Sequence, residues 1–174
     1  MDQEISAGIV VYRRTQEGPK FLVLYHGHNY WNFAKGKIES EEKSFAAALR
    51  ETREETGLGE KDLRITRNFK AYERFHFRRS GKQVFKIVIF YMAETTKHEI
   101  KISHEHQGYA WFLYNEAKGI LGKYKDSQKV LRKAYEHLRP KSDRSRPANP
   151  QRPNPNLPGG GAPRRIPPSV PGSR

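Results

Sequence analysis

This 174-residue chain contains no cysteine, so disulfides and thiolate metal sites are excluded. No apolar run is long enough to cross a membrane or resembles a signal peptide, and we expect a cytoplasmic protein. Proline is nearly absent before residue 139, where Pro19 is the single example, whereas ten prolines follow. Acidic residues are scarce, 19 against 33 Lys and Arg. We therefore expect one globular domain, residues 1–138, followed by a segment of different composition.

The excess of positive charge is divided between these two segments. The formal net charge is +14; residues 139–174 hold eight Lys or Arg and one Asp, which gives +7 and leaves +7 for residues 1–138. A basic domain suits a polyanionic partner such as a nucleotide or a nucleic acid. Charge that serves solubility and attracts RNA without specificity is the alternative, and composition alone does not choose between them.

Residues 139–174 are rich in proline, glycine and arginine. Such a segment buries too little apolar surface to offset its ordering entropy, so we expect a disordered basic tail. Its prolines suit a partner groove that binds polyproline II, and its arginines suit contact with RNA. A passive solubilising tail fits the same composition.

One acidic stretch dominates the domain, between Gly36 and Leu58. We expect a short loop to residue 39 and then a helix of about four turns. Ser40 is the expected N-cap, acidic residues fill the first turn, and Gly57 is the expected C-terminal stop. Three apolar residues would form the packing side: Phe45, Ala46 and Leu49.

The other side of this helix carries three carboxylates, Glu51, Glu54 and Glu55, within an arc of roughly 100°. At ~5 Å and an effective dielectric of about 20, each pair repels by about 3 kcal/mol, and a cation would relieve that repulsion. Ligands that are all oxygen favour a hard ion, Mg²⁺ or Mn²⁺. The alternative is a solvated helix face on which Arg50 and Arg53 pair with the carboxylates.

The spacing of the acidic stretch resembles the signature of the Nudix hydrolases. The one departure is Thr52, which stands where the signature has an apolar residue. The resemblance implies an α/β/α sandwich with a mixed sheet, and hydrolysis of a phosphoric anhydride. It also makes a metal site a better explanation of the three carboxylates than a solvent-exposed helix face. The matching residues are Gly36, Glu42, Arg50, Glu51, Glu54, Glu55, Gly57 and Leu58.

The same resemblance implies roles within the stretch. Glu54 and Glu55 would ligate the metal, and the Gly36 carbonyl would be a further ligand. Glu51 would ligate the metal or act as the general base that accepts a proton from the attacking water. Arg50 would orient the carboxylates rather than touch phosphate.

Outside the stretch, the segment SHEHQGYAWF, which contains Glu105, resembles part of the asymmetrically cleaving diadenosine tetraphosphate hydrolases within this family. Glu105 would then be a metal ligand or the general base, in competition with Glu51. An exposed loop carboxylate is the alternative for Glu105. Residues 31–39 are similar to the approach to the signature in the same group, with Ala34 in place of a proline.

Substrate contacts also follow from this resemblance. Lys35 and Lys86 would contact the phosphate chain, and a lysine at position 86 is otherwise hard to explain within an apolar strand. His28, near the acidic stretch, is a candidate contact for phosphate or base. Adenine would stack on aromatic rings, each of which is also an ordinary core candidate. These rings are Phe75, Phe77 and Tyr124.

Alternation and turn signals predict the remaining elements. A hairpin is expected around Ser80-Gly81, and its second arm should be buried on both faces because Val84–Met92 is almost wholly apolar. The order of strands and helices agrees with the α/β/α sandwich. The expected strands cover 5–14, 21–25, 63–67, 69–79, 82–94, 99–102 and 109–114, and the later helices begin near 115 and cover 126–138.

We predict a monomeric, metal-dependent hydrolase of nucleoside polyphosphates that cleaves diadenosine tetraphosphate to ATP and AMP. An RNA 5′-pyrophosphohydrolase with the same metal site is the alternative within the family, and the basic tail favours it. An alternative of another class is a catalytically inactive nucleotide- or RNA-binding module. That alternative predicts a broken acidic set, whereas Glu51, Glu54 and Glu55 are all present.

Overall fold

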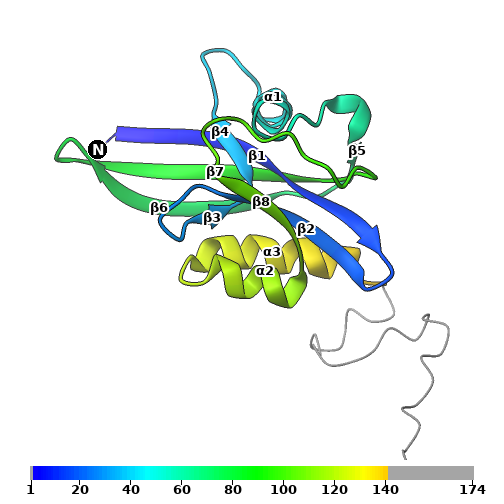
Figure 1. Cartoon of the computed structure of the whole chain (residues 1–174). Coiled ribbons are helices and arrows are strands. Elements are labelled where there is room, and N and C mark those ends of the chain that lie inside the picture. Colours follow the sequence, from blue (N-terminus) through cyan, green and yellow to red (C-terminus); the bar gives the residue numbers. More distant parts are fainter. Residues whose placement is uncertain (1, 141–174) are drawn as a thin grey trace, which may run out of the picture.

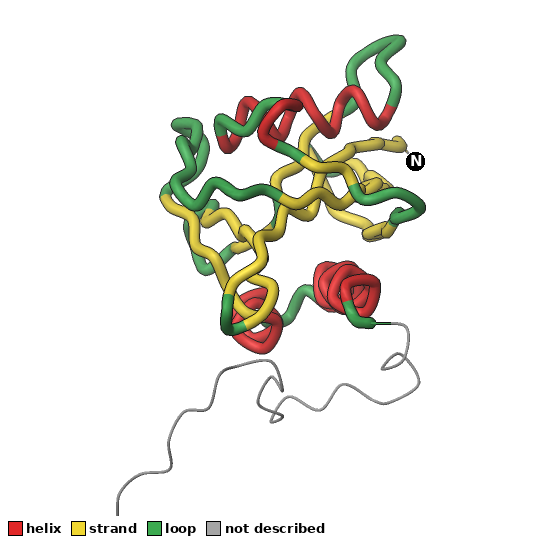
Figure 2. Tube along the Cα trace, turned by 90° about the vertical axis from the view of Figure 1, so that its right-hand side faces the viewer, coloured by secondary structure: helices red, strands yellow, loops and turns green. Residues whose placement is uncertain are grey.

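The computed structural model describes residues 2–140, which form three layers. A mixed sheet of eight strands lies between helix α1 (Ser44–Thr56) on one face and helices α2 (Tyr114–Leu121) and α3 (Lys125–Leu138) on the other (Figure 1). Figure 2 shows the two helical layers separated by the strands. The predicted α/β/α sandwich with a mixed sheet is confirmed. The predicted tail lies outside the described residues from 141 onward, and no helix within residues 2–140 is long and apolar enough to cross a membrane.

Two long strands form the centre of the sheet. Strand β1 (Asp2–Thr15) runs parallel to β7 (Lys82–Glu94), with β-branched residues along both. Parallel neighbours need a long crossover connection, and here the segment containing α1 supplies it.

Four antiparallel strands complete one side of β1. Strand β2 (Gly18–Tyr25) turns back from β1 and pairs with β8 (Gly108–Leu113) and with β3 (Trp31–Asn32). Strand β4 (Ala34–Lys37) pairs with the first half of β1. Strands β3 and β4 were not predicted, because two and four residues of mixed polarity are too short to show alternation.

The predicted hairpin joins β6 (Ala71–Arg79) to β7 through Ser80 and Gly81, whose φ angles are 50° and 78°. Two consecutive positive φ angles are typical of a type I′ turn, whose twist matches that of the strands. Strand β5 (Arg64–Ile65) pairs with the far end of β7. Figure 1 shows the hairpin tip projecting beyond the helices of both layers.

This projection explains why β7 is not buried on both faces as predicted. Val88 and Phe90 point toward α2 and α3 and are fully buried. Ile87 and Ile89 point to the other face and are only half-buried, because α1 does not extend over the hairpin.

Alternate residues of the strands supply two separate cores, as the period of two in a strand requires. One core packs against α1 and includes Ala7, Ile9, Val11, Leu22, Leu24, Ala47 and Ala48. The other packs against α2 and α3 and includes Val10, Phe21, Val23, Phe33, Phe90, Leu121 and Leu131.

Helix α1 begins later than predicted. Its N-cap residue is Lys43, which makes no side-chain cap hydrogen bond, and the first turn holds no acidic residue. Ser40 is not the N-cap because residues 39–42 form a turn, in which Glu41 has a φ of 64°. The C-terminal end agrees with the prediction, since Gly57 ends the helix with a φ of 73°.

The packing side of α1 agrees with the prediction at Phe45 and Leu49, which are half-buried, and differs from it at Ala46. Ala46 is exposed, whereas Ala47, Ala48 and Thr52 are buried against the sheet. Small residues on this side let the helix lie close to β1. As a consequence the acidic residues at one edge of this side reach the backbone of β4.

No strand forms at residues 99–102, where an edge strand was predicted. The backbone amides of this segment find other acceptors. The Ile100 N–H donates to the Tyr109 hydroxyl at 3.2 Å, and the Lys101 N–H donates to the Thr56 carbonyl at 3.1 Å. The segment therefore binds the end of α1 instead of extending the sheet.

Candidate active site

Gly36 lets the backbone of β4 approach a carboxylate of α1. A Cβ at this position would lie 1.9 Å from the carboxyl carbon of Glu51 and 2.0 and 2.2 Å from its oxygens, so any side chain here would displace the Glu51 carboxylate. Burial raises the pKa of Glu51, ion pairing with Arg50 opposes the shift, and repulsion by Glu54 and Glu105 adds to it. The site thus begins with a partly desolvated carboxylate held against a glycine.

Arg50 binds three carboxylates and a carbonyl. Its Nε and Nη2 donate to the two oxygens of Glu42, each at 3.0 Å. Its Nη1 donates to Glu51 at 2.7 Å and to Glu54 at 3.4 Å. Nη2 also donates to the Lys37 carbonyl at 3.0 Å. The guanidinium therefore ties the loop before α1 to the helix, and Glu42 reaches it because the helix begins after Glu42.

Glu55 is 7% exposed and is hydrogen-bonded to β4. The backbone N–H of Lys35 donates to its Oε2 at 2.8 Å, and Nε2 of His106 lies 3.4 Å from its Oε1. His106 is held on its other side, where Nδ1 lies 3.0 Å from the Ser103 hydroxyl. Burial raises the pKa of Glu55 to about 7; the Lys35 amide and ammonium oppose this shift, and neighbouring carboxylates add to it.

These carboxylates carry negative charge that the protein compensates only in part. Glu105, in the exposed loop before β8, raises the pKa of both Glu51 and Glu55 by repulsion. Among the described residues, no three His, Asp or Glu side chains converge closely enough to form a metal site as they stand, and Arg50 bridges Glu51 and Glu54. The mutual repulsion of the carboxylates and their all-oxygen donors nevertheless fit a hard divalent cation.

Lys35 connects this cluster to the other face of the sheet. Side chains alternate along a strand, so Lys35 points toward the side of α2 and α3, whereas Gly36 faces α1. The Lys35 ammonium lies 5.8 Å from the ring centre of Tyr30, and Tyr30 meets Tyr124 edge-on with centroids 5.0 Å apart. The structure therefore brings the predicted residues Lys35 and Tyr124 together around Tyr30.

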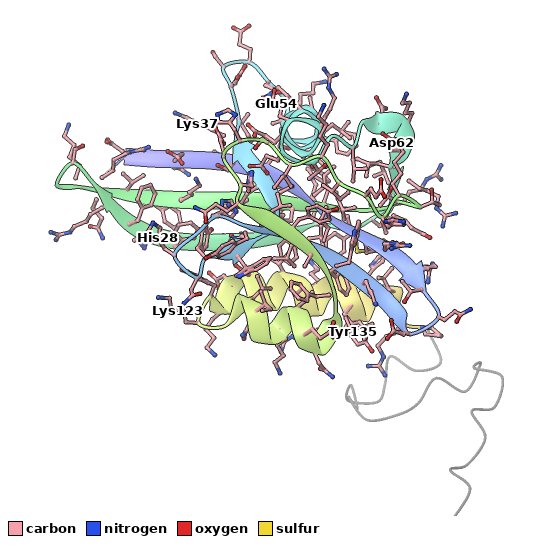
Figure 3. All side chains as sticks on the ribbon, in the orientation of Figure 1. His28, Lys37, Glu54, Asp62, Lys123 and Tyr135 are labelled. Carbon is pink, nitrogen blue, oxygen red and sulfur yellow. The ribbon has the colours of Figure 1, made fainter. Side chains whose placement is uncertain are left out.

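His28 lies in the exposed loop between β2 and β3 and has a φ of 51°. Figure 3 shows His28 toward the α2–α3 layer, on the side of Lys123, whereas Glu54 and Lys37 lie on the α1 side. The structure does not bring His28 to the carboxylates.

The remaining predicted substrate residues lie on the hairpin, on the same face as Lys35. Phe75 and Phe77 have ring centroids 6.2 Å apart, and Phe75 is 36% exposed. Lys86 has an ion-pair partner that the sequence did not indicate, because its Nζ lies 2.7 Å from Oε1 of Glu4. Arg79 binds the other oxygen of Glu4 at 2.8 Å. Two cations thus share one carboxylate, and a net positive charge remains beside the aromatic rings.

Two groups near Lys35, the buried Glu73 and the half-buried His26, were not predicted. Glu73 is 2% exposed and accepts a hydrogen bond of 2.6 Å from the Ser127 hydroxyl; burial raises its pKa. His26 packs edge-on against His106, with centroids 4.5 Å apart, and burial lowers its pKa to about 4. No motif marks either residue, although the period of two along β6 would have placed Glu73 on the buried face.

Comparison with known proteins decides the family. The NUDIX domain model matches residues 2–138. The chain belongs to the Nudix family. A bis(5′-nucleosyl)-tetraphosphatase [asymmetrical] of Mus musculus is 32% identical to this Nudix pyrophosphohydrolase over 143 residues, which cover 76% of this chain and 94% of the mouse protein. The protein of the same name from Caenorhabditis elegans is 30% identical over 131 residues, which cover 74% and 91% of the two chains.

Solved structures and a partial relative complete the comparison. The structure of a C. elegans Ap4A hydrolase binary complex is similar to this Nudix hydrolase with a TM-score of 0.67 and 29% identity, and the match covers 78% of this chain and 97% of that one. An RNA pyrophosphohydrolase of Edwardsiella ictaluri (strain 93-146) is 38% identical over 71 residues, which cover 39% of each chain.

Proposed function

We propose that this Nudix hydrolase cleaves diadenosine tetraphosphate to ATP and AMP. The arrangement of β4 carries the proposal. Its Lys35 amide binds Glu55, its Gly36 meets Glu51, and its Lys35 side chain points into the space beside Tyr30. A cation suited to phosphate thereby extends from the same short strand whose backbone contacts the two carboxylates. The relatives in mouse and C. elegans that carry the name of this activity match nearly their whole length.

Mg²⁺ or Mn²⁺ would be held by the Gly36 carbonyl and by Glu51, Glu54, Glu55 and Glu105. When bound, such an ion neutralises phosphate oxygens and lowers the pKa of a bound water. The electrostatics of the carboxylates support this assignment. Burial and repulsion between neighbours raise the pKa of Glu51 and Glu55, and a bound cation would stabilise the charged form of both.

The residues of this chain would have separate roles in hydrolysis of the anhydride. A water oxygen forms a bond to phosphorus while the anhydride bond on the opposite side breaks, and the proton of that water passes to Glu51 or Glu105. Arg50 positions Glu51 and fixes the loop before α1. Lys35 and Lys86 neutralise the phosphate chain, with Lys86 exchanging its present partner for phosphate.

The adenine rings would stack on Phe75, Phe77 or Tyr124, whose side chains lie on the face toward which Lys35 points. Stacking needs only a flat π-surface, so phenylalanine serves as well as tyrosine. We also propose that His28, in its exposed loop, contacts a phosphate or a base of the substrate.

The second candidate is hydrolysis of 5′-triphosphorylated RNA, which the partial likeness to an RNA pyrophosphohydrolase favours. Turnover of diadenosine tetraphosphate and of a triphosphorylated RNA is measured side by side in Mg²⁺, with products separated by chromatography. ATP plus AMP with slow RNA conversion supports the first candidate. Fast pyrophosphate release from RNA with little dinucleotide cleavage moves the function to RNA ends.

The metal assignment is tested with a matched pair of variants. Glu54→Gln should reduce turnover by more than about tenfold with the fold intact, because it removes a ligand charge without changing shape. Glu60→Gln, on the exposed 3-10 helix Glu60–Asp62, should leave turnover unchanged. Equal activity of both variants contradicts the assignment.

We also propose that the catalytic unit ends near residue 138. Deleting residues 140–174 should leave dinucleotide hydrolysis nearly unchanged, and circular dichroism should show an intact fold. A large loss of activity without unfolding would show that the tail belongs to the catalytic unit.

A further inference from the structure

One side of β6 alternates positive and aromatic residues. Lys70, just before the strand, is followed at every second position by Tyr72, Arg74, His76 and Arg78. Residues of this spacing share one face of a strand. Their face is the α1 side, since the intervening Ala71 and Glu73 point to the core under α3. We call these five residues the β6 strip.

The β6 strip is exposed. Figure 1 shows that the hairpin extends past α1, so no helix of residues 2–140 covers this part of the sheet. Tyr72 is 40% exposed, and the Arg74 guanidinium lies 4.8 Å from the centre of its ring. His76 stacks on Phe85 of β7, with centroids 4.7 Å apart and an interplanar angle of 29°. The strip therefore presents flat rings with cations between them.

A hollow of about 480 Å³ adjoins the strip at Lys70. Its lining includes Phe45, Arg67 and Tyr91 besides Lys70 itself. The rings of Phe45 and Tyr91 meet edge-on at 5.0 Å, and the Lys70 ammonium lies 5.5 Å from the Tyr91 ring centre. The pattern of aromatic surface beside positive charge thus continues beyond the strand.

The charge that β6 and β7 present on this face is of one sign, and the nearby carboxylate of Asp126 accepts a hydrogen bond from the Arg74 backbone N–H at the edge of β6. The side chains of β7 that share it, from Gln83 to Tyr91 at every second position, are uncharged, and the strip itself holds no carboxylate. Rings that accept stacking bases and cations that follow a phosphate backbone are the two requirements for binding a single strand. From Lys70 to Arg78 there are eight steps along the chain, which span roughly 27 Å in extended backbone, enough for several nucleotides.

We propose that the β6 strip binds single-stranded nucleic acid, with bases stacked on Tyr72 and on the His76–Phe85 pair and phosphates against Arg74 and Arg78. The site lies on the opposite face of the hairpin from Phe75 and Phe77. It is therefore separate from the proposed adenine contacts and does not depend on the proposed hydrolysis.

The test uses the full chain and a fluorescent 12-nucleotide RNA with a 5′-hydroxyl end, which offers no anhydride to hydrolyse. Binding is followed by fluorescence anisotropy over a range of salt concentrations, beside the same sequence as single-stranded DNA and as a duplex. The charge variant is Arg74→Ala/Arg78→Ala. Its matched control is Lys61→Ala/Lys118→Ala, which removes two exposed lysines elsewhere on the surface.

The charge variant should reduce the slope of log K against log salt by about 1.4, because each lost phosphate contact on a single strand contributes roughly 0.7. Tyr72→Ala should weaken binding about fivefold or more and leave the slope unchanged, since it removes one stacking surface and no charge. The control should match the wild type. Hydrolysis of diadenosine tetraphosphate should be the same in all variants.

Three results overturn the proposal. The first is equal loss of binding in the charge variant and in its control, which would mean nonspecific attraction. The second is full binding by the charge variant, which would place the contact elsewhere on the chain. The third is equal affinity for the duplex, because its paired bases cannot stack on the strip. A preference between RNA and DNA identifies which single strand is the ligand.

Discussion

Replacing Glu55 by glutamine should stabilise the protein without metal and impair it as an enzyme. Burial raises the pKa of Glu55 to about 7, so the folded protein binds this proton more tightly than the unfolded chain does. The stability associated with Glu55 is therefore fully present below the unfolded pKa of 4.5 and is lost as the pH rises to about 7. Glutamine has nearly the same shape, carries no charge and still accepts the Lys35 amide hydrogen bond.

The size of this effect follows from the shift. A pKa that rises from 4.5 to about 7 corresponds to roughly 3 kcal/mol once the group is ionised in both states. Part of the loss has already occurred at pH 5. Between pH 5 and pH 8 the wild type should therefore lose about 2–3 kcal/mol of stability that Glu55→Gln does not lose.

Urea unfolding at pH 5 and pH 8, with a chelator present, measures this difference. Glu60→Gln, which removes an exposed carboxylate, should follow the pH dependence of the wild type. Addition of Mg²⁺ at pH 8 should raise the stability of the wild type more than that of Glu55→Gln, since a ligand stabilises the state it binds. Identical pH dependence of Glu55→Gln and the wild type in chelator would refute the reasoning.

Three further substitutions test individual contacts. Gly36→Ala should cut turnover by more than about tenfold because its Cβ would displace Glu51, whereas Gly119→Ala, with nothing within 4 Å of its added Cβ, should be as active as the wild type. Arg50→Lys should lower kcat more than it raises KM, because lysine cannot make the paired contacts of a guanidinium; equal kinetics would contradict its positioning role. Thr52→Val should stabilise the fold by about 1 kcal/mol in thermal or urea unfolding, since the Thr52 hydroxyl has no hydrogen-bond partner among the described residues; a loss of stability would show that the hydroxyl is satisfied.

The sequence predicted those parts of the fold that have a long regular pattern. The hairpin around Ser80-Gly81 and the helix over 126–138 agree with the structure because alternation, turn residues and helical spacing all act locally. Strands β3 and β4 form because they pair with β2 and β1, and no local sequence pattern predicts them. The segment 99–102 has strand-like residues, but its amides bond to α1 and to a tyrosine hydroxyl, which only the tertiary arrangement determines.

In the candidate site, too, local sequence spacing was predictable and contacts between distant segments were not. Fixed spacing identified Gly36, Glu51 and Glu55, and the structure gives each a physical role in one contact between β4 and α1. The contact of His106 with Glu55 could not be predicted, because it depends on how the loop before β8 lies against the helix. For Lys86 the sequence suggested a functional role, because a lysine is unusual within an apolar strand. The structure shows that Lys86 also forms an ion pair with Glu4 on β1, and a contact between residues so far apart in the chain could not be predicted from the sequence.

Strand β6 provides a last test, because its two faces are assigned to different ligands. Phe75 points to the face of Lys86 and the proposed adenine contacts, and Tyr72 points to the β6 strip on the other face. Phe75→Ala should raise the KM for diadenosine tetraphosphate several-fold with a smaller effect on kcat, since one stacked base contributes on the order of 1 kcal/mol to binding. Tyr72→Ala should leave both constants unchanged. If the two variants raise KM equally, the faces of the hairpin do not act separately, and the assignment of adenine to the α3-facing side is wrong.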